Sequence, residues 1–197
     1  MKENLEQILL QELTNNEKVG FLISGGFDSS LLLYICCLLK KELGLNTEFK
    51  IFTIPRHDDS KTHANRVVDF ISKFFDMKFD THIVGDPDAH HNIVPSGINE
   101  ALKLVNLVLI GDNKNPDHMP DGPLRPKAIS KTILQPFYNY TKKDIVELAI
   151  KVDIIKEISA ISHTCNASKT LKCNKCYPCR ERAWAFAENN HIDIGTM

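Results

Sequence analysis

SGGFDSS, residues 24–30, is the stretch that decides how this chain is built. The run VGFLI (19–23) before it has the length and β-branched content of a buried strand, and LLLYICCLL (31–39) after it predicts a buried helix. Glycines between a strand and a helix let the backbone turn sharply and approach a ligand closely. Because the first amides of a helix point outward at the positive end of its dipole, the stretch predicts a phosphate-binding loop.

The pattern on either side of this loop alternates between strands and helices. Further extended segments are predicted at residues 48–54, 79–84, 106–111 and 132–137. Further helices are predicted at 4–14, from Ser60 as the N-cap through Phe75, near 97–104, and at 142–151 behind a Thr141–Asp144 capping box. Residues 112–131, with four prolines, are expected to be an irregular loop. This order predicts an α/β fold with a parallel, doubly wound sheet.

The carboxyl ends of parallel strands meet at one rim, where ligands bind. The loops after the first, second and fourth strands are therefore expected to face one site. His57 and His63 lie near the second of these loops and are either adenine neighbours or merely exposed residues. Asp112 and Asn113, after the fourth strand, have a predicted role in binding substrate or magnesium.

Length and composition narrow the class of protein. The chain has 197 residues, enough for one α/β domain and a small appendage. Hydrophobic residues make up 43% and charged residues 25%, which favours a globular protein over a disordered one. A net charge of −1 gives no strong nucleic-acid signal. No apolar run is long enough to span a membrane and the N-terminus does not resemble a signal peptide, so a cytoplasmic protein without a membrane partner is expected.

The cysteines fall into two groups. Cys36 and Cys37 lie within the apolar helix and are expected to be core residues. The other four follow a C-x7-C-x2-C-x2-C pattern, at Cys165, Cys173, Cys176 and Cys179. Four thiolates at this spacing suit a tetrahedral structural zinc site. An iron–sulfur cluster also uses C-x2-C-x2-C runs, and metal-free thiols remain a third interpretation.

The loop and the cysteines together carry a resemblance to a known family. SGGFDS matches the SGGxDS signature of the PP-loop, or N-type ATP pyrophosphatase, superfamily, and it lacks the Gly-Lys-Ser/Thr ending of a Walker A loop. With the C-terminal cysteines, the chain resembles the 7-cyano-7-deazaguanine synthase (QueC-like) family. The resemblance extends through QPFYNYTKKDIVELA (135–149), TC (164–165), Arg182 and Phe186. It departs at VPSGIN (94–99), where Ile98 replaces an expected arginine.

The resemblance implies an adenine nucleotide alpha hydrolase-like fold in two parts. Residues 1–150 would form the PP-loop ATP-binding domain, and residues 151–197 a C-terminal helical and four-cysteine zinc-binding segment packed on it. The implied cofactors are ATP, Mg²⁺ and one structural Zn²⁺ per chain. The implied catalytic residues are Ser24, Asp28 and Lys142. Nucleotide contacts are expected, from the resemblance and from position at the rim, at Ser24, Gly25, Gly26, Phe27, Asp28, Ser29, Ser30, Thr53, Ile54, Gly111 and Asp112.

Several of these residues keep two interpretations. Asp28, being negative, is expected to bind magnesium or cap the helix rather than contact phosphate. Lys142 either contacts phosphate or is a solvated residue of a first helical turn. Arg182 either reaches the nucleotide or packs against the cysteine segment. The pair His90 and His91 is expected to lie in a loop.

The family's reaction converts 7-carboxy-7-deazaguanine to the 7-cyano base. ATP adenylylates the carboxylate with release of pyrophosphate, ammonia displaces AMP to give an amide, and a second activation dehydrates the amide to the nitrile. Activation is needed because a carboxylate oxygen is a poor leaving group, and the enzyme mainly aligns the reactants and screens charge. The implied partners are the deazapurine carboxylate and ammonia, with a homodimer plausible by resemblance. The alternatives are another PP-loop adenylylating enzyme, such as a tRNA base thiolase or an amidating ligase, and a non-catalytic ATP-binding module.

Overall fold

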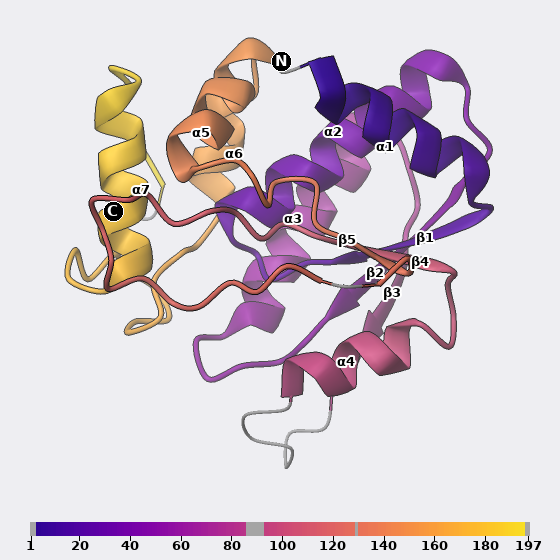
Figure 1. Cartoon of the computed structure of the whole chain (residues 1–197), viewed down its shortest axis with the longest axis horizontal. Helices are drawn as coiled ribbons and strands as arrows, with labels where there is room; N and C mark the ends of the chain where they lie inside the picture. The colour runs from indigo at the N-terminus through magenta and orange to yellow at the C-terminus, as the bar shows by residue number, and fades with distance from the viewer. Residues whose placement is uncertain (1–2, 86–92, 129, 196–197) are drawn as a thin grey trace.

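A five-stranded, all-parallel sheet forms the centre of the protein (Figure 1). The structure, a computed structural model, describes residues 3–85, 93–128 and 130–195, so the pair His90 and His91 lies outside the described residues. The strands are β1 (Lys18–Leu22), β2 (Glu48–Thr53), β3 (Asp80–Ile83), β4 (Leu107–Ile110) and β5 (Ile133–Leu134). They lie in the order β3-β2-β1-β4-β5, which confirms the predicted parallel sheet.

Helices cover both faces of this sheet. They are α1 (Glu3–Asn15), α2 (Phe27–Leu43), α3 (Ser60–Phe75), α4 (Ile93–Ala101), α5 (Lys142–Lys151), α6 (Ile155–Ile161) and α7 (Tyr177–Glu188). Figure 1 shows α4 beneath the sheet, on the side opposite α1 and α2. The predicted doubly wound α/β fold is therefore confirmed.

Alternation along the strands gives each face its own core. Phe21, Ile51 and Leu109 belong to the larger core, which α1, α2, α3 and α5 complete. Phe52 and Val108 lie in the smaller core, between the sheet and α4. Successive residues of a strand point to opposite faces, so one run of apolar residues supplies both cores.

Helix α2 begins earlier than the sequence predicted, at Phe27 rather than residue 31, and ends at Leu43. The loop motif therefore contains the first helical turn. The hydroxyls of Ser29 and Ser30 both donate to the carbonyl oxygen of Gly26, at 3.2 and 2.6 Å, so these polar residues fit a helix start as well as a loop. The helix stops at Gly44, whose φ of 63° is easily reached by glycine.

Two other helix starts also differ from expectation. The predicted N-cap Ser60 is the first residue of α3, and Asp59 occupies the cap position without a side-chain cap bond. The Ser60 hydroxyl instead donates to the Ile54 carbonyl at 2.8 Å. Helix α4 starts at Ile93, before Pro95, because proline is tolerated in a first helical turn. The capping box predicted at Thr141 and Asp144 is confirmed.

The segment after residue 150 packs on the rest of the chain. Its buried residues Ile158, Ala185 and Phe186 belong to the same core as Phe27 and Leu31 of α2. In Figure 1, α5, α6 and α7 lie together at one end of the sheet. Among residues 3–85, 93–128 and 130–195, no helix has both the length and the apolar character that crossing a membrane requires.

Candidate functional site

A pocket of about 480 Å³ opens where the strand order reverses, between β1 and β4. The chain leaves these two adjacent strands in opposite directions, and such a switch point leaves a crevice at the carboxyl ends of the strands. The pocket is bounded by the start of α2, by α4, by residues 125–128 and by the ends of β1, β4 and β5. Its volume is in the range of small-molecule sites.

Four residues of the 24–30 stretch line this pocket: Ser24, Gly26, Asp28 and Ser29. The Ser24 hydroxyl accepts a hydrogen bond from the Gly26 amide at 3.3 Å and lies 3.4 Å from the Ser29 hydroxyl. Gly25 has a φ of +78°, and a Cβ there would overlap His63. The turn therefore needs glycine, and it brings the open N-terminal amides of α2 to the pocket, where they can bind an anion.

The structure brings about half of the predicted nucleotide contacts to the pocket. The residues that line it are Ser24, Gly26, Asp28, Ser29, Gly111 and Asp112. Gly111 is held close to α2, because a Cβ on it would lie 2.7 Å from the Ser29 amide nitrogen. Asn113 also lines the pocket, as its position after the fourth strand suggested.

The other predicted contacts do not line the pocket. Phe27 is buried and packs edge-to-face on Phe186 at 5.6 Å, and Ser30 is turned toward the Gly26 carbonyl. The carbonyl of Gly25 accepts a hydrogen bond from the His163 amide.

Thr53 and Ile54, expected to offer backbone contacts to adenine, are buried at the end of β2. Their carbonyls already accept hydrogen bonds, from the Val84 amide and the Ser60 hydroxyl respectively. The sequence could not reveal this, because both donors come from later elements.

A buried ion pair joins two of the three predicted catalytic residues. Lys142 Nζ, at the start of α5, donates to Asp28 Oδ2, and the two side chains are only 3% and 15% exposed. The interpretation of Lys142 as a solvated residue is therefore wrong. Asp28 is not the helix cap either, because Gly26 takes that position.

The two carboxylate oxygens of Asp28 differ in their surroundings. Oδ1 is buried and has no hydrogen-bond partner among the described residues. Burial raises the pKa of Asp28, and the positive charge of Lys142 opposes that rise. An oxygen of this kind at the edge of a phosphate loop fits a divalent cation bound together with phosphate.

A second buried pair, which sequence reasoning missed, lies beside the first. Glu181 of α7 accepts hydrogen bonds from Arg125 Nη1 and Nη2, at 3.0 and 3.1 Å, and from Asn113 Nδ2 at 3.1 Å. Burial tends to raise the pKa of Glu181, but the charges of Lys142 and Arg125 and the hydrogen bonds from Arg125 and Asn113 lower it below its usual value. Nothing local distinguishes Glu181 from a solvated helix residue, so no sequence signal would have found it.

The two histidines near the second strand have different surroundings. His57 is exposed. His63 is buried and stacks on His163 with ring centroids 4.1 Å apart, behind the phosphate loop, so the exposed interpretation is wrong for His63. Burial, followed by the neighbouring His163, lowers the pKa of His63.

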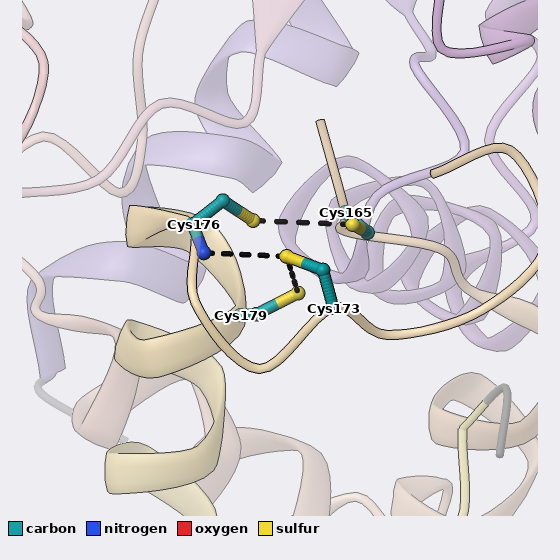
Figure 2. Close-up of side chains that lie close together, drawn as sticks. All are labelled: Cys165, Cys173, Cys176 and Cys179. Atoms are coloured by element: carbon teal, nitrogen blue, oxygen red, sulfur yellow. Dashed lines mark hydrogen bonds between the residues drawn. The ribbon is translucent and has the colours of Figure 1, made fainter. Parts of the chain in front are cut away.

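The four C-terminal cysteines converge on one point (Figure 2). Their sulfur atoms all lie within 4.8 Å of one another, with Cys173 and Cys179 at 4.0 Å and Cys165 and Cys176 at 3.9 Å. A single tetrahedral ion with sulfur ligands at about 2.3 Å separates its sulfurs by roughly 3.8 Å. The cluster therefore fits one metal ion with four protein ligands. Backbone amides of Cys176 and Lys175 lower the pKa of Cys173 to about 6.

Arg182 lies beside this cluster and does not line the pocket. Its guanidinium donates to Asp193 near the C-terminus, with both contacts within 2.9 Å, and to the hydroxyls of Ser162 and Thr164 at 3.0 Å. The side chain is fully buried. The interpretation that it packs against the cysteine segment is the one the structure supports.

Comparisons with known proteins agree with this arrangement. No curated protein sequence matches the chain. The chain is similar in structure to the U34-tRNA thiolase NcsA from Methanococcus maripaludis with its 4Fe-4S cluster, at 13% identity and a TM-score of 0.50 over 97% of this chain and 80% of that one. It is also similar to the NAD+ synthetase from Burkholderia pseudomallei, at 16% identity and a TM-score of 0.52 over 79% of this chain and 67% of that one.

A match to a family model covers the C-terminal part of the chain. The model of the queuosine biosynthesis protein QueC matches residues 123–190, which contain Arg125, Lys142, Glu181 and the four cysteines. The structural similarities concern the fold alone and extend over most of the chain. The predicted resemblance is therefore confirmed for residues 123–190, which are similar to the QueC family, and the chain shares its α/β fold with the two solved structures.

Proposed function

We propose that this protein is an ATP-using PP-loop enzyme that activates the carboxylate of 7-carboxy-7-deazaguanine and, with ammonia, converts it to 7-cyano-7-deazaguanine. One observation carries the proposal. The phosphate loop lies at the strand switch point with Lys142 and the unpartnered Asp28 Oδ1 beside it. The match to the QueC model over residues 123–190 supports the choice of reaction.

Different residues of the chain would bind the phosphates of ATP and the Mg²⁺ ion. The amides at the start of α2 and the Ser24 and Ser29 hydroxyls would hold phosphate oxygens of ATP. Asp28 Oδ1 would share a Mg²⁺ ion with those phosphates, and Lys142 would keep Asp28 ionised and in place. When bound, ATP supplies an electrophilic phosphorus and a pyrophosphate leaving group.

The opposite wall of the pocket suits a flat heterocycle. Val94, Pro95 and Ile98 of α4 line the pocket, as do Leu22 and Ile110. An apolar wall binds a planar base by contact and excludes water from an activated intermediate. Because Ile98 carries no charge, the carboxylate of the substrate must be recognised by another residue.

The four-cysteine cluster would hold a structural zinc ion. Four protein sulfurs leave no open coordination position, so the ion would stabilise the C-terminal segment rather than activate water. The cluster ends at α7, the helix that carries Glu181.

A second candidate function is tRNA base thiolation. Its support is the structural similarity to a U34-tRNA thiolase that carries a 4Fe-4S cluster. In that case the cysteines would hold an iron–sulfur cluster. The sulfur–sulfur distances match those between ligands of a single metal ion, which favours zinc over an iron–sulfur cluster.

The test is one assay with a matched pair of variants. Zinc-loaded protein is mixed with Mg-ATP, ammonium and 7-carboxy-7-deazaguanine, while pyrophosphate release and the mass of the base are followed. We expect the nitrile, AMP and pyrophosphate. Lys142→Gln should lower the rate about 100-fold, whereas Lys143→Gln, which removes an exposed lysine of the same helix paired with Glu188, should change it little.

Three outcomes would go against this proposal. Pyrophosphate release with another carboxylate only would keep the activation chemistry and reject the deazaguanine substrate. A thiolated tRNA product with an iron-containing protein would establish the second candidate. ATP binding without pyrophosphate release under any condition would indicate a binding module.

A further inference from the structure

The guanidinium of Arg125 lies in the wall of the pocket and is only partly occupied. Nη1 donates to Asn113 Oδ1 at 2.6 Å, to the Asn113 carbonyl at 3.0 Å and to Glu181 Oε1 at 3.0 Å. Nη2 donates once, to Glu181 Oε2 at 3.1 Å. These bonds occupy the edge of the planar guanidinium group between Nη1 and Nη2.

The Nε–Nη2 edge of the guanidinium group has no hydrogen-bond partner among the described residues. Within the part of the chain that the structure describes, neither Nε nor the second hydrogen of Nη2 makes a hydrogen bond. The Arg125 side chain is 17% exposed, and Arg125 lines the pocket. Two parallel donors on a rigid plane match the two oxygens of a carboxylate or phosphate.

Among the described residues, the other cations in the pocket or next to it do not present a free pair of parallel donors. Arg56 uses its corresponding Nε–Nη2 edge for Asp58, at 3.3 and 2.7 Å. Lys142 is buried against Asp28. Lys127 is exposed and lies over the Tyr138 ring. Arg125 is therefore the pocket cation that combines burial with a free pair of donors in the described residues.

Glu181 holds Arg125 in this orientation. Its side chain is 1% exposed and bonds both nitrogens at the far end of the fork, while its Oε1 also accepts from Asn113. The helix behind it is fixed in the core by Ala185 and Phe186. With three donors held, the guanidinium plane is fixed in orientation, and so is its free edge.

We infer that Arg125 binds an oxyanion of the substrates through its Nε–Nη2 edge, and that Glu181 is the positioning residue for this contact. The identity of the oxyanion rests on the proposed function. It is either a phosphate of the nucleotide or the carboxylate of the acceptor, which no residue of α4 can neutralise. Neutralising charge by a fixed bidentate donor pair favours binding and alignment in either case.

Binding measurements without turnover test the contact. Inorganic pyrophosphate with Mg²⁺ and 7-carboxy-7-deazaguanine are titrated separately into wild-type protein, Arg125→Lys and Arg125→Gln. We expect Arg125→Gln to raise the Kd of at least one probe about 10- to 100-fold, and Arg125→Lys to have a smaller effect because it keeps the charge but not the fork. Loss with pyrophosphate assigns the phosphate, and loss with the base but not with its amide assigns the carboxylate.

Arg180→Gln is the matched control. It removes a surface ion pair to Asp121 that, like Arg125–Glu181, ties the loop after β4 to α7. Binding of both probes should be unchanged in this variant. Equal weakening by Arg180→Gln and Arg125→Gln would indicate only a tether, and unchanged Kd values in folded Arg125→Gln and Arg125→Lys would overturn the inference.

A double-mutant cycle tests Glu181. Glu181→Gln should weaken the same probe as Arg125→Gln, the double variant should be no weaker than Arg125→Gln alone, and Glu181→Asp should partly restore binding. Additive losses, or a loss of stability without a change in Kd, would reject the positioning role. If binding depends on Arg125 but no nitrile forms, the inference stands and the proposed reaction fails.

Discussion

The phosphate loop and the C-terminal cysteine segment are both short irregular structures, but they are held in different ways. In the loop, Ser24, Ser29 and Ser30 all bond to or near Gly26, within five residues along the chain. In the cysteine segment, Arg182 bonds to residues 11 to 23 positions away, and four separate cysteines meet at one point. The first region is shaped mainly by bonds between neighbouring residues, to which His163 and Lys142 add two distant contacts, whereas the second closes only when distant parts of the chain are in place.

The comparison has an energetic consequence. A locally determined turn loses little when a distant contact is removed, whereas a segment closed by long-range contacts loses its structure with any of them. The predictions below separate the two regions, beginning with the largest effect.

Removal of the metal ion that we propose for the cysteine cluster should have the largest effect. Chelation, or Cys176→Ser, should lower the Tm by about 10 °C or more, because ligand binding contributes folding free energy of the whole C-terminal segment. Thermal unfolding with metal analysis measures this. Lys175→Ala, an exposed change within the same segment, is the control and should leave the Tm nearly unchanged. A metal-free protein with an unchanged Tm would show that the segment closes without the ion.

Loss of the Asp193 carboxylate should come next. Asp193→Asn leaves the buried Arg182 without its charge partner and should cost about 3 kcal/mol of unfolding free energy at neutral pH. Urea unfolding measures this. Asp80→Asn, which breaks an exposed pair with Lys50, should cost much less.

The contribution of Asp193 to the unfolding free energy should depend on pH. Burial tends to raise the pKa of Asp193, but the charge of Arg182 and the bonds from Lys172 and Arg182 lower it overall. A carboxyl whose folded-state pKa is depressed stabilises the protein above its ordinary pKa of about 4 and loses that contribution as the pH falls through the depressed value. The stability gap between wild type and Asp193→Asn should therefore shrink below about pH 4. A gap that stays constant with pH would contradict the assignment.

Within the loop region, two glycines with similar backbones form a matched pair. Gly25 and Gly44 have φ values of +78° and +63°, but a Cβ at Gly25 would overlap His63 whereas a Cβ at Gly44 meets nothing within 4 Å. Gly44→Ala should cost about 1 kcal/mol from backbone strain alone, and Gly25→Ala about 2 to 3 kcal/mol. Gly25→Ala should also weaken pyrophosphate binding. Equal costs at the two positions would show that the loop can shift away from α3.

The smallest effect is expected at the capping box. Thr141→Ala removes the hydroxyl that accepts from the Asp144 amide and should cost about 1 kcal/mol. Thr62→Ala, which removes an exposed hydroxyl bonded to Asp59, should be close to neutral. The box directly precedes Lys142. If the loss of pyrophosphate binding free energy exceeded the loss of unfolding free energy, this helix start would belong to the binding site.

The elements that the sequence predicted well are those that depend on neighbouring residues. The Thr141–Asp144 box and helix α5 were located correctly because the two bonds of the capping box join residues only three apart. The start of α2 was missed because Asp28, Ser29 and Ser30 are equally at home in a loop and in a first helical turn. The cap of α3 was missed because Ser60 bonds to the end of β2 instead.

The candidate site was predictable only in part, because some of its residues are placed by their neighbours in sequence and others by distant parts of the chain. SGGFDSS and the cysteine spacing identify the loop and the four-cysteine cluster, since spacing along the chain suffices for both. The roles of Thr53 and Ile54 were not readable, because the groups that occupy their carbonyls arrive from β3, its following residues and α3. The burial of Lys142 likewise depends on Asp28, which is 114 residues away in sequence.

The sequence by itself determined the alternation of strands and helices, the glycine turn between β1 and α2, and the four-cysteine cluster, because each is encoded in residue types at short spacing. Only the tertiary structure decided that Glu181, 56 residues after Arg125, orients that arginine in the pocket, and that Lys142 is paired beneath the loop. These pairings depend on packing α5 and α7 against α2, which no local pattern specifies. A charged residue on a helix has the same sequence signature whether it faces solvent or a buried partner, and the fold alone separates the two.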